Sequence, residues 1–188
     1  MSRPLRAILF VTIMAVLSCP LVLAGPPQWT YLEAGFLNVD PDDLEAGDSA
    51  FAGASLGFLK NFHVNGRYVD GDYTNDASLT YWQFGAGWHG GLGEKADLVA
   101  EARWVDTEIE DFSSDGMGLT GGVRWKPVEF FELDGFVNWV DYDDDSVDSY
   151  EVRAIFDVWR IGIGAAAELE SDVNQYSAFV RFNFGEKK

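Results

Sequence analysis

The sequence predicts an all-β fold, a closed antiparallel up-and-down barrel of ten strands, with eight strands as the alternative. Three observations lead to this prediction: apolar and polar residues alternate with a period of two, the alternating segments are about ten residues long, and tight turns alternate along the chain with Asp-rich connections. No segment after residue 25 keeps a helical period for long. An even number of strands allows an antiparallel sheet to close on itself.

The alternation is clearest in the middle of the chain. In one segment Leu98 and Trp104 share an apolar face, whereas Glu101 and Arg103 occupy the other face, as expected of a strand with two unlike sides. Continuing this count predicts ten strands, at residues 29–38, 50–59, 62–70, 79–89, 95–106, 116–125, 130–140, 149–158, 160–169 and 175–184.

The connections differ at the two ends of the predicted strands. After the first, third, fifth, seventh and ninth strands come Asp-rich connections, such as residues 40–43 and 141–145. After the second, fourth, sixth and eighth strands the connections are mostly tight, as at Lys60-Asn61. This alternation predicts short turns at one end of the barrel, polar loops at the other, and both chain termini at the turn end.

The first 24 residues have the composition of a secretory signal peptide. Arg3 and Arg6 precede an apolar run, and residues 22–24 suit cleavage before Gly25. We therefore expect residues 1–24 to be removed and residues 25–188 to form one barrel domain. The formal net charge of the whole chain is −18, and removal of two arginines makes it more negative. Such acidity argues against nucleic acid as a partner.

Alternation alone does not say which face points inward, because a soluble lipocalin-like barrel alternates too. Here the aromatic residues of the apolar face fall into two bands at opposite strand ends, with aliphatic residues between them. Two such bands are typical of the two membrane–water interfaces, so the fold is predicted to be a transmembrane β-barrel with its apolar face toward lipid. The tryptophans of these bands are Trp82, Trp88, Trp104, Trp125, Trp139 and Trp159.

The other face is predicted to line a charge-paired, mostly plugged lumen. Acidic residues and arginine are nearly balanced on this face, which suits pairing inside a narrow barrel. The predicted lumen charges are Glu33, Arg67, Glu101, Arg103, Arg124, Glu132, Glu151, Arg153, Glu168 and Arg181. Phe51, Phe136 and Phe179 also have the inner parity, and Trp29 is out of phase with its strand; these residues either fill the lumen or mark bulges.

Several segments resemble the small outer-membrane β-barrel family, which includes the OmpA-like transmembrane domains, and the pattern is most similar to its ten-stranded bacterial members. The segments are residues 61–64, 66–68, 82–88, 97–100 and 179–184. The resemblance implies the outer membrane of a Gram-negative cell envelope, periplasmic termini, and lipid and lipopolysaccharide as surroundings. It also implies the barrel-assembly machinery as a partner during biogenesis; that machinery reads a terminal aromatic, whereas here four residues follow Phe184.

Motifs for catalysis are not evident, so we predict a protein that is not an enzyme and has no cofactor. The sequence has no G-x-S-x-G elbow, metal-binding His pair or phosphate loop. His63 and His89 are predicted to be interfacial or turn residues. Asp141, Asp143 and Asp145 are weak metal candidates, because their spacing lacks the glycine and final glutamate of an EF-hand. We expect at most loose binding of divalent cations at the acidic loops.

The sequence therefore favours a non-enzymatic barrel with a structural, envelope-integrity or surface-contact role. Two alternatives stay open. One is a narrow, porin-like channel, because a ten-stranded barrel lies between small filled barrels and wide pores. The other is a soluble periplasmic barrel that carries an apolar ligand, because lipocalin-like barrels alternate in the same way.

Overall fold

The computed structural model describes residues 27–42, 44–74, 77–110, 112–142 and 145–184, so the predicted signal peptide lies outside the described residues. Within these ranges, no helix is long and apolar enough to span a membrane. The strands are β1 (Tyr31–Pro41), β2 (Gly47–Phe58), β3 (Phe62–Thr74), β4 (Ala77–Gly91), β5 (Ala96–Ile109), β6 (Phe112–Val128), β7 (Phe131–Tyr142), β8 (Ser146–Val158), β9 (Ile161–Leu169) and β10 (Val173–Asn183).

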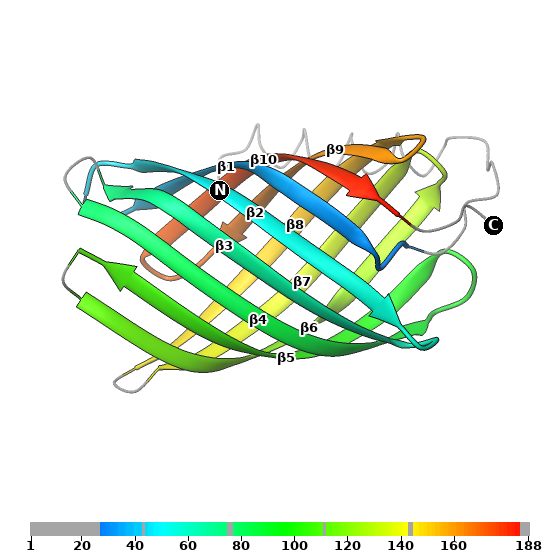
Figure 1. Ribbon diagram of the computed structural model, residues 1–188, viewed down its shortest axis with the longest axis horizontal. Helices are drawn as coiled ribbons and strands as arrows, with labels where there is room; N and C mark the ends of the chain where they lie inside the picture. The colour runs from blue at the N-terminus through cyan, green and yellow to red at the C-terminus, as the bar shows by residue number, and fades with distance from the viewer. Residues whose placement is uncertain (1–26, 43, 75–76, 111, 143–144, 185–188) are drawn as a thin grey trace, which may run out of the picture.

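The strands form a closed, all-antiparallel barrel, which confirms the predicted fold class and strand number; the alternative of eight strands is wrong. Each strand pairs with the next in sequence, and β10 pairs with β1 to close the ring. The strands are steeply inclined to the long axis of the barrel (Figure 1). Closure leaves no sheet edge with unpaired backbone groups.

The two ends of the barrel are named here by the chain. The terminal end holds the start of β1, the end of β10 and the connections 59–61, 92–95, 129–130 and 159–160; the distal end holds the other five connections. The distal connections are shorter than predicted, because the strands continue into the Asp-rich segments. Asp70 and Asp72, for example, belong to β3, where Asp72 pairs with Ser78 of β4. Ladder hydrogen bonds satisfy the backbone there, whatever the polarity of the side chains.

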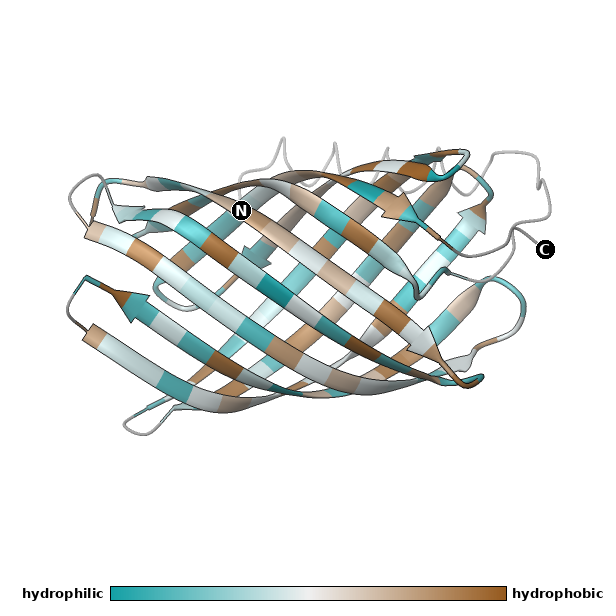
Figure 2. Cartoon of the chain, viewed as in Figure 1, coloured by the Kyte–Doolittle hydropathy of each residue, from teal (hydrophilic) through white to brown (hydrophobic). Residues whose placement is uncertain are grey.

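The outer surface carries the apolar residues of the alternation, and hydrophobic and hydrophilic residues follow one another along each strand (Figure 2). Between the aromatic bands the outward aliphatic side chains are more than half exposed: Leu119 56%, Val137 52%, Val152 55%, Ile163 62% and Val180 53%. Five of the six predicted interface tryptophans are exposed, at 38–67%, and Trp125 is half-buried. Soluble monomers rarely expose a continuous apolar belt of this kind.

Part of the interior is apolar. Phe51 and Phe179, which have the inner parity, face the interior and meet edge to face with their ring centroids 6.3 Å apart. Gly164 leaves room for this packing, because an added Cβ would lie 2.4 Å from the Phe179 ring. The other buried members of this cluster are Leu37, Val39, Val69, Leu79 and Ile155.

Candidate functional site: the barrel lumen

The charged side chains predicted for the lumen lie inside the barrel in the structure. Nine of them line a single internal cavity of about 240 Å³: Glu33, Arg67, Glu101, Arg103, Arg124, Glu151, Arg153, Glu168 and Arg181. The tenth, Glu132, is 3% exposed and contacts two of these arginines. This arrangement, with charged residues inside and apolar residues outside, is the opposite of the arrangement in a soluble carrier, whose cavity is apolar.

Arg181 is the centre of an ion-pair network near the terminal end. Its Nε and Nη2 atoms donate hydrogen bonds of 3.1 and 3.0 Å to Glu33 Oε2, and its Nη1 donates one of 3.2 Å to Glu132 Oε1. Arg153 Nη2 donates a further bond of 2.8 Å to the same Glu33 oxygen. Arg181 is 2% exposed, and its guanidinium lies 4.0 Å from the centre of the Tyr31 ring. Each buried charge here therefore has a partner that offsets its desolvation.

A second group of pairs extends this network across the terminal end. Arg124 Nη2 donates a 2.5 Å hydrogen bond to Glu132 Oε1, and its Nε lies 3.7 Å from Asp134 Oδ2. Lys126 Nζ donates a hydrogen bond to Asp157 Oδ2. All of these side chains are at most 10% exposed, so basic groups and carboxyl groups are packed closely together at this end of the lumen.

The segment before β1 lies at the terminal end of the barrel, where Trp29 lines the cavity. The Trp29 ring stacks on His63 and His89, with centroid distances of 4.4 and 4.2 Å, and the Arg124 guanidinium lies 4.4 Å from its centre. Trp29 Nε1 donates a 2.8 Å hydrogen bond to Asp97 Oδ2. These partners come from four adjacent strands, β3 to β6, so the Trp29 ring packs against one side of the interior. We call Trp29 with its ring partners His63, His89 and Arg124 the Trp29 plug.

The prediction that His63 and His89 are interfacial or turn residues is wrong. Both lie near the terminal ends of their strands, but their rings point inward, at 1% and 8% exposure. His63 Nε2 lies 3.0 Å from Glu101 Oε2, a pair that could serve acid–base chemistry elsewhere. In this barrel the Trp29 ring stacks on His63, and His63 and Glu101 both line the internal cavity.

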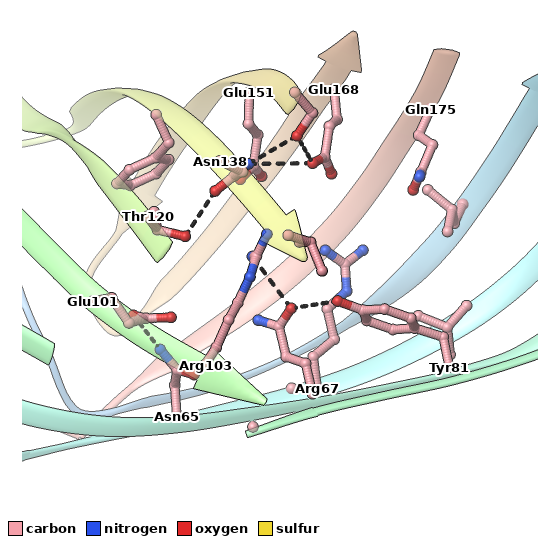
Figure 3. Close-up of a pocket in the computed structure, with 18 of the residues that line it drawn as sticks. Asn65, Arg67, Tyr81, Glu101, Arg103, Thr120, Asn138, Glu151, Glu168 and Gln175 are labelled. Atoms are coloured by element: carbon pink, nitrogen blue, oxygen red, sulfur yellow. Dashed lines mark hydrogen bonds between the residues drawn. The ribbon is translucent and has the colours of Figure 1, made fainter. Parts of the chain in front are cut away.

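The distal part of the cavity has polar side chains with fewer ionic partners. Thr120, Asn138, Ser149 and Glu168 form a chain in which Thr120 Oγ1 donates to Asn138 Oδ1 at 2.8 Å and Ser149 Oγ donates to Glu168 Oε1 at 2.5 Å (Figure 3). Asn138 Nδ2 also donates to Glu168 Oε1, at 3.2 Å. This chain holds the Glu168 carboxylate in place without a cation.

On the facing strands, Gln83 Oε1 accepts a 2.7 Å bond from the Tyr81 hydroxyl and a 3.4 Å bond from Arg103 Nη1 (Figure 3). Arg67, directly opposite Gln83 in the β3–β4 register, packs its guanidinium 4.1 Å from the centre of the Phe51 ring. Side chains at the distal rim of the cavity, such as Tyr142 and Glu170, are only half-buried. The cavity is therefore more accessible from the distal end than from the terminal end.

The weak metal candidates are not brought together among the described residues. Asp141 is exposed on β7, Asp145 Oδ1 accepts a 2.8 Å hydrogen bond from the Ser146 amide, and Asp143 lies outside the described residues. The described part of the chain has no group of three His, Cys, Asp or Glu residues that could hold a metal ion.

No family model matches the chain, and no curated protein matches it in sequence. Two structures of the KdgM porin, one in complex with disordered oligogalacturonate, match it with a TM-score of 0.50 and 9% identity, over 81% of this chain and 99% of the porin. The two proteins share a fold.

Two other solved barrels are less similar to this chain. Neisserial surface protein A has a TM-score of 0.41 and 13% identity, over 83% of this chain and 96% of its own. Ail, the attachment invasion locus protein of Yersinia pestis, has a TM-score of 0.39 and 15% identity, over 82% and 99%.

Several lumen residues were missed at the sequence level although the alternation contained a signal for them. His63 has the same parity as Arg67, Asp97 the same as Glu101, and Lys126 the same as Arg124. Extending each inner face by one or two steps would have found these residues. Trp29, which is out of phase with its predicted strand, lies before β1 and lines the cavity, as one of the two expectations for it stated.

Proposed function

We propose that the chain is an exported, integral outer-membrane barrel of a Gram-negative bacterium, non-enzymatic, with a structural, envelope-integrity or surface-contact role. Residues 1–24 act as the signal peptide, the terminal end faces the periplasm, and the distal end faces the exterior. Lipid and lipopolysaccharide surround the apolar belt, and the barrel-assembly machinery inserts the chain. The observation that carries the proposal is the inversion of polarity, with a continuous apolar outer belt around a core of paired charges.

The outward-facing apolar belt favours a membrane location, because the same belt would be unfavourable in water. The exposed aliphatic belt would cost roughly 25 cal/mol for each Å² left in contact with water, and acyl chains remove this cost. Aromatic residues at both ends of the belt suit the interfaces, where one side of a ring is wet and the other apolar. Backbone closure satisfies the requirement that no unpaired group faces hydrocarbon.

Cell fractionation and gel mobility test this proposal. We expect the protein in the outer-membrane fraction, and we expect an unboiled detergent sample to migrate differently from a boiled one, because a closed barrel resists the detergent until heated. Recovery from the soluble periplasm with the same mobility before and after boiling would contradict the proposal. Quenching of tryptophan fluorescence by lipid-embedded quenchers gives an independent readout, since a soluble carrier would show none.

A narrow porin is the second candidate, favoured by the internal cavity and by the fold shared with the KdgM porin. The Trp29 plug and the Arg181 network argue against it, because they pack rings and charged groups closely together on the periplasmic side. In planar bilayers we expect the wild-type protein to show no steady openings. Steady single-channel openings in the wild type, altered by Arg103→Ala or Arg153→Ala, would favour the porin instead.

A further inference from the structure

Within the part of the chain that the structure describes, two of the five cavity arginines form no ion pair with a carboxylate within 4 Å. Arg124, Arg153 and Arg181 each lie within 4 Å of at least one carboxylate oxygen. Arg67 and Arg103 have no such ion pair among the described residues. Among the same residues, the Nε atom of each is buried without a hydrogen-bond partner, as are the Nε atoms of Arg124 and Arg153, and Arg103 Nη1 donates only to Gln83. This is unexpected in a chain with 31 acidic and 13 basic residues. A buried donor without a partner costs stability, so these two guanidiniums are suited to accept a partner from outside.

On the opposite wall of the cavity, two carboxylates share one paired cation. Glu151 of β8 and Glu168 of β9 stand directly opposite each other in the strand register, an arrangement in which like charges repel. Arg153 is their nearest paired cation, 3.6 Å from Glu151 Oε1, and it also binds Glu33. Among the described residues, the hydrogen bonds to the Glu168 carboxylate come from the hydroxyl of Ser149 and the amide of Asn138. A cation placed between the two carboxylates would remove their repulsion.

The two arginines without an ion pair and the two facing carboxylates lie on different strands of the cavity wall, which Arg153 of β8 and Glu101 of β5 also line. Arg67 and Arg103 lie on β3 and β5, and Glu151 and Glu168 lie on β8 and β9, with all four side chains lining the same space (Figure 3). At about 30 Å³ per water molecule, its volume of about 240 Å³ corresponds to roughly eight waters. A molecule of similar size could contact both walls.

We infer that this cavity binds a small zwitterion, with its carboxylate toward Arg67 and Arg103 and its ammonium group toward Glu151 and Glu168. A carboxylate matches the planar donor fork of a guanidinium, and an ammonium group satisfies two carboxylates at once. The inference rests on the proposed function only for the side of entry: the cavity is more accessible from the distal end, so the ligand enters from the exterior.

The rim of the distal end explains why a neutral zwitterion fits better than an anion. Exposed carboxylates surround this rim, including Asp42, Asp72, Glu110, Asp145 and Asp172. The described basic residues outside the lumen, Lys60, Lys95 and Arg160, all lie at the terminal end. Such a field repels an anion on approach and does not repel a molecule without net charge. A simple organic cation would pass the rim but would leave both arginines unpaired.

Calorimetric titration of the folded protein in detergent tests the inference. The probes are ω-amino acids from glycine to 6-aminohexanoate, with butyrate and butylamine as matched probes of one charge. We expect at least one ω-amino acid to bind with a Kd on the order of 1 mM or tighter. Butyrate and butylamine should bind at least tenfold more weakly, because each satisfies only one wall.

Variants then locate the site. Arg67→Met, Arg103→Met and Glu168→Gln should each weaken binding at least tenfold, whereas Arg160→Met, an arginine in a terminal turn, should leave it unchanged. Each variant is first checked for the heat-dependent gel shift, so that loss of folding is distinguished from loss of binding. The inference fails if no ω-amino acid binds, if butyrate binds equally well, or if folded Arg103→Met binds normally. A protein that keeps its heat-dependent shift but binds nothing leaves the proposed barrel function intact and overturns this inference alone.

Discussion

The two halves of the lumen contain the same kinds of residue but differ in how their charges are matched. Toward the terminal end, Glu33 and Glu132 each bond directly to Arg181, and all three side chains are almost fully buried. Toward the distal end, Arg67, Arg103 and Glu168 lack ionic partners within the described chain and line an accessible cavity. Complete pairing makes a charge part of the packed interior, whereas incomplete pairing leaves it available to a ligand. Mutations in the two halves should therefore affect different properties.

The largest effect is expected from Arg181→Met. Removal of this guanidinium leaves Glu33 and Glu132 buried with fewer partners, which should cost about 3 to 5 kcal/mol of unfolding free energy. Urea unfolding in detergent or lipid vesicles measures the change. Arg103→Met is the matched control, because it removes an arginine without breaking an ion pair and should cost less than about 1 kcal/mol. Equal losses for the two variants would mean that the halves do not differ as described.

An intermediate effect is expected from Trp29→Ala. Loss of this half-buried ring removes its stacking on two histidines and should cost about 2 kcal/mol, below the range for fully buried aromatic residues. It should also expose His63 to a water-soluble histidine-modifying reagent, detected by mass spectrometry.

Trp29→Phe provides the control for this experiment. It keeps a ring in the mouth but loses the hydrogen bond to Asp97, so His63 should stay largely protected. If His63 is modified equally fast in the wild type and in Trp29→Ala, the Trp29 ring does not shield it.

The smallest effect concerns Glu170, in the connection between β9 and β10 at the rim of the cavity. Burial, with the neighbouring carboxylates of Glu168 and Asp172, raises the pKa of Glu170 from 4.5 to about 7. The folded protein therefore binds this proton more tightly than the unfolded chain. The contribution of the protonated Glu170 side chain to the stability of the fold is complete below about pH 4.5 and is lost as the pH rises through 7.

Glu170→Gln separates this contribution from that of the other carboxylates. Thermal unfolding of the variant and the wild type should give the same free energy of unfolding at pH 4.5. At pH 8 the free energy of unfolding of the variant should be higher by less than about 1 kcal/mol, because the half-exposed group is screened by water. A variant that is less stable than the wild type at pH 8 would contradict the assigned cause.

The architecture could be predicted from the sequence because a two-residue period reports directly which side of a strand each residue occupies. For this reason the ten strands and the closed antiparallel barrel were predicted correctly. The alternation could not predict which charges pair, because Arg181 and Glu33 lie 148 residues apart and meet only in the folded barrel. Nor could it predict that β3 continues through Asp70 and Asp72, because the polarity of an Asp-rich segment suggests a loop while its backbone still forms ladder bonds.

Ring closure also has a consequence for assembly. Glu33 and Arg181 stand directly opposite each other on β1 and β10, the two strands whose meeting seals the cylinder. If the seam slid by two positions, Glu33 would face Phe179 or Asn183, and the pair between Glu33 and Arg181 would be lost. The correct alignment places this buried pair in contact, so a misaligned closure is less stable by the loss of one buried ion pair.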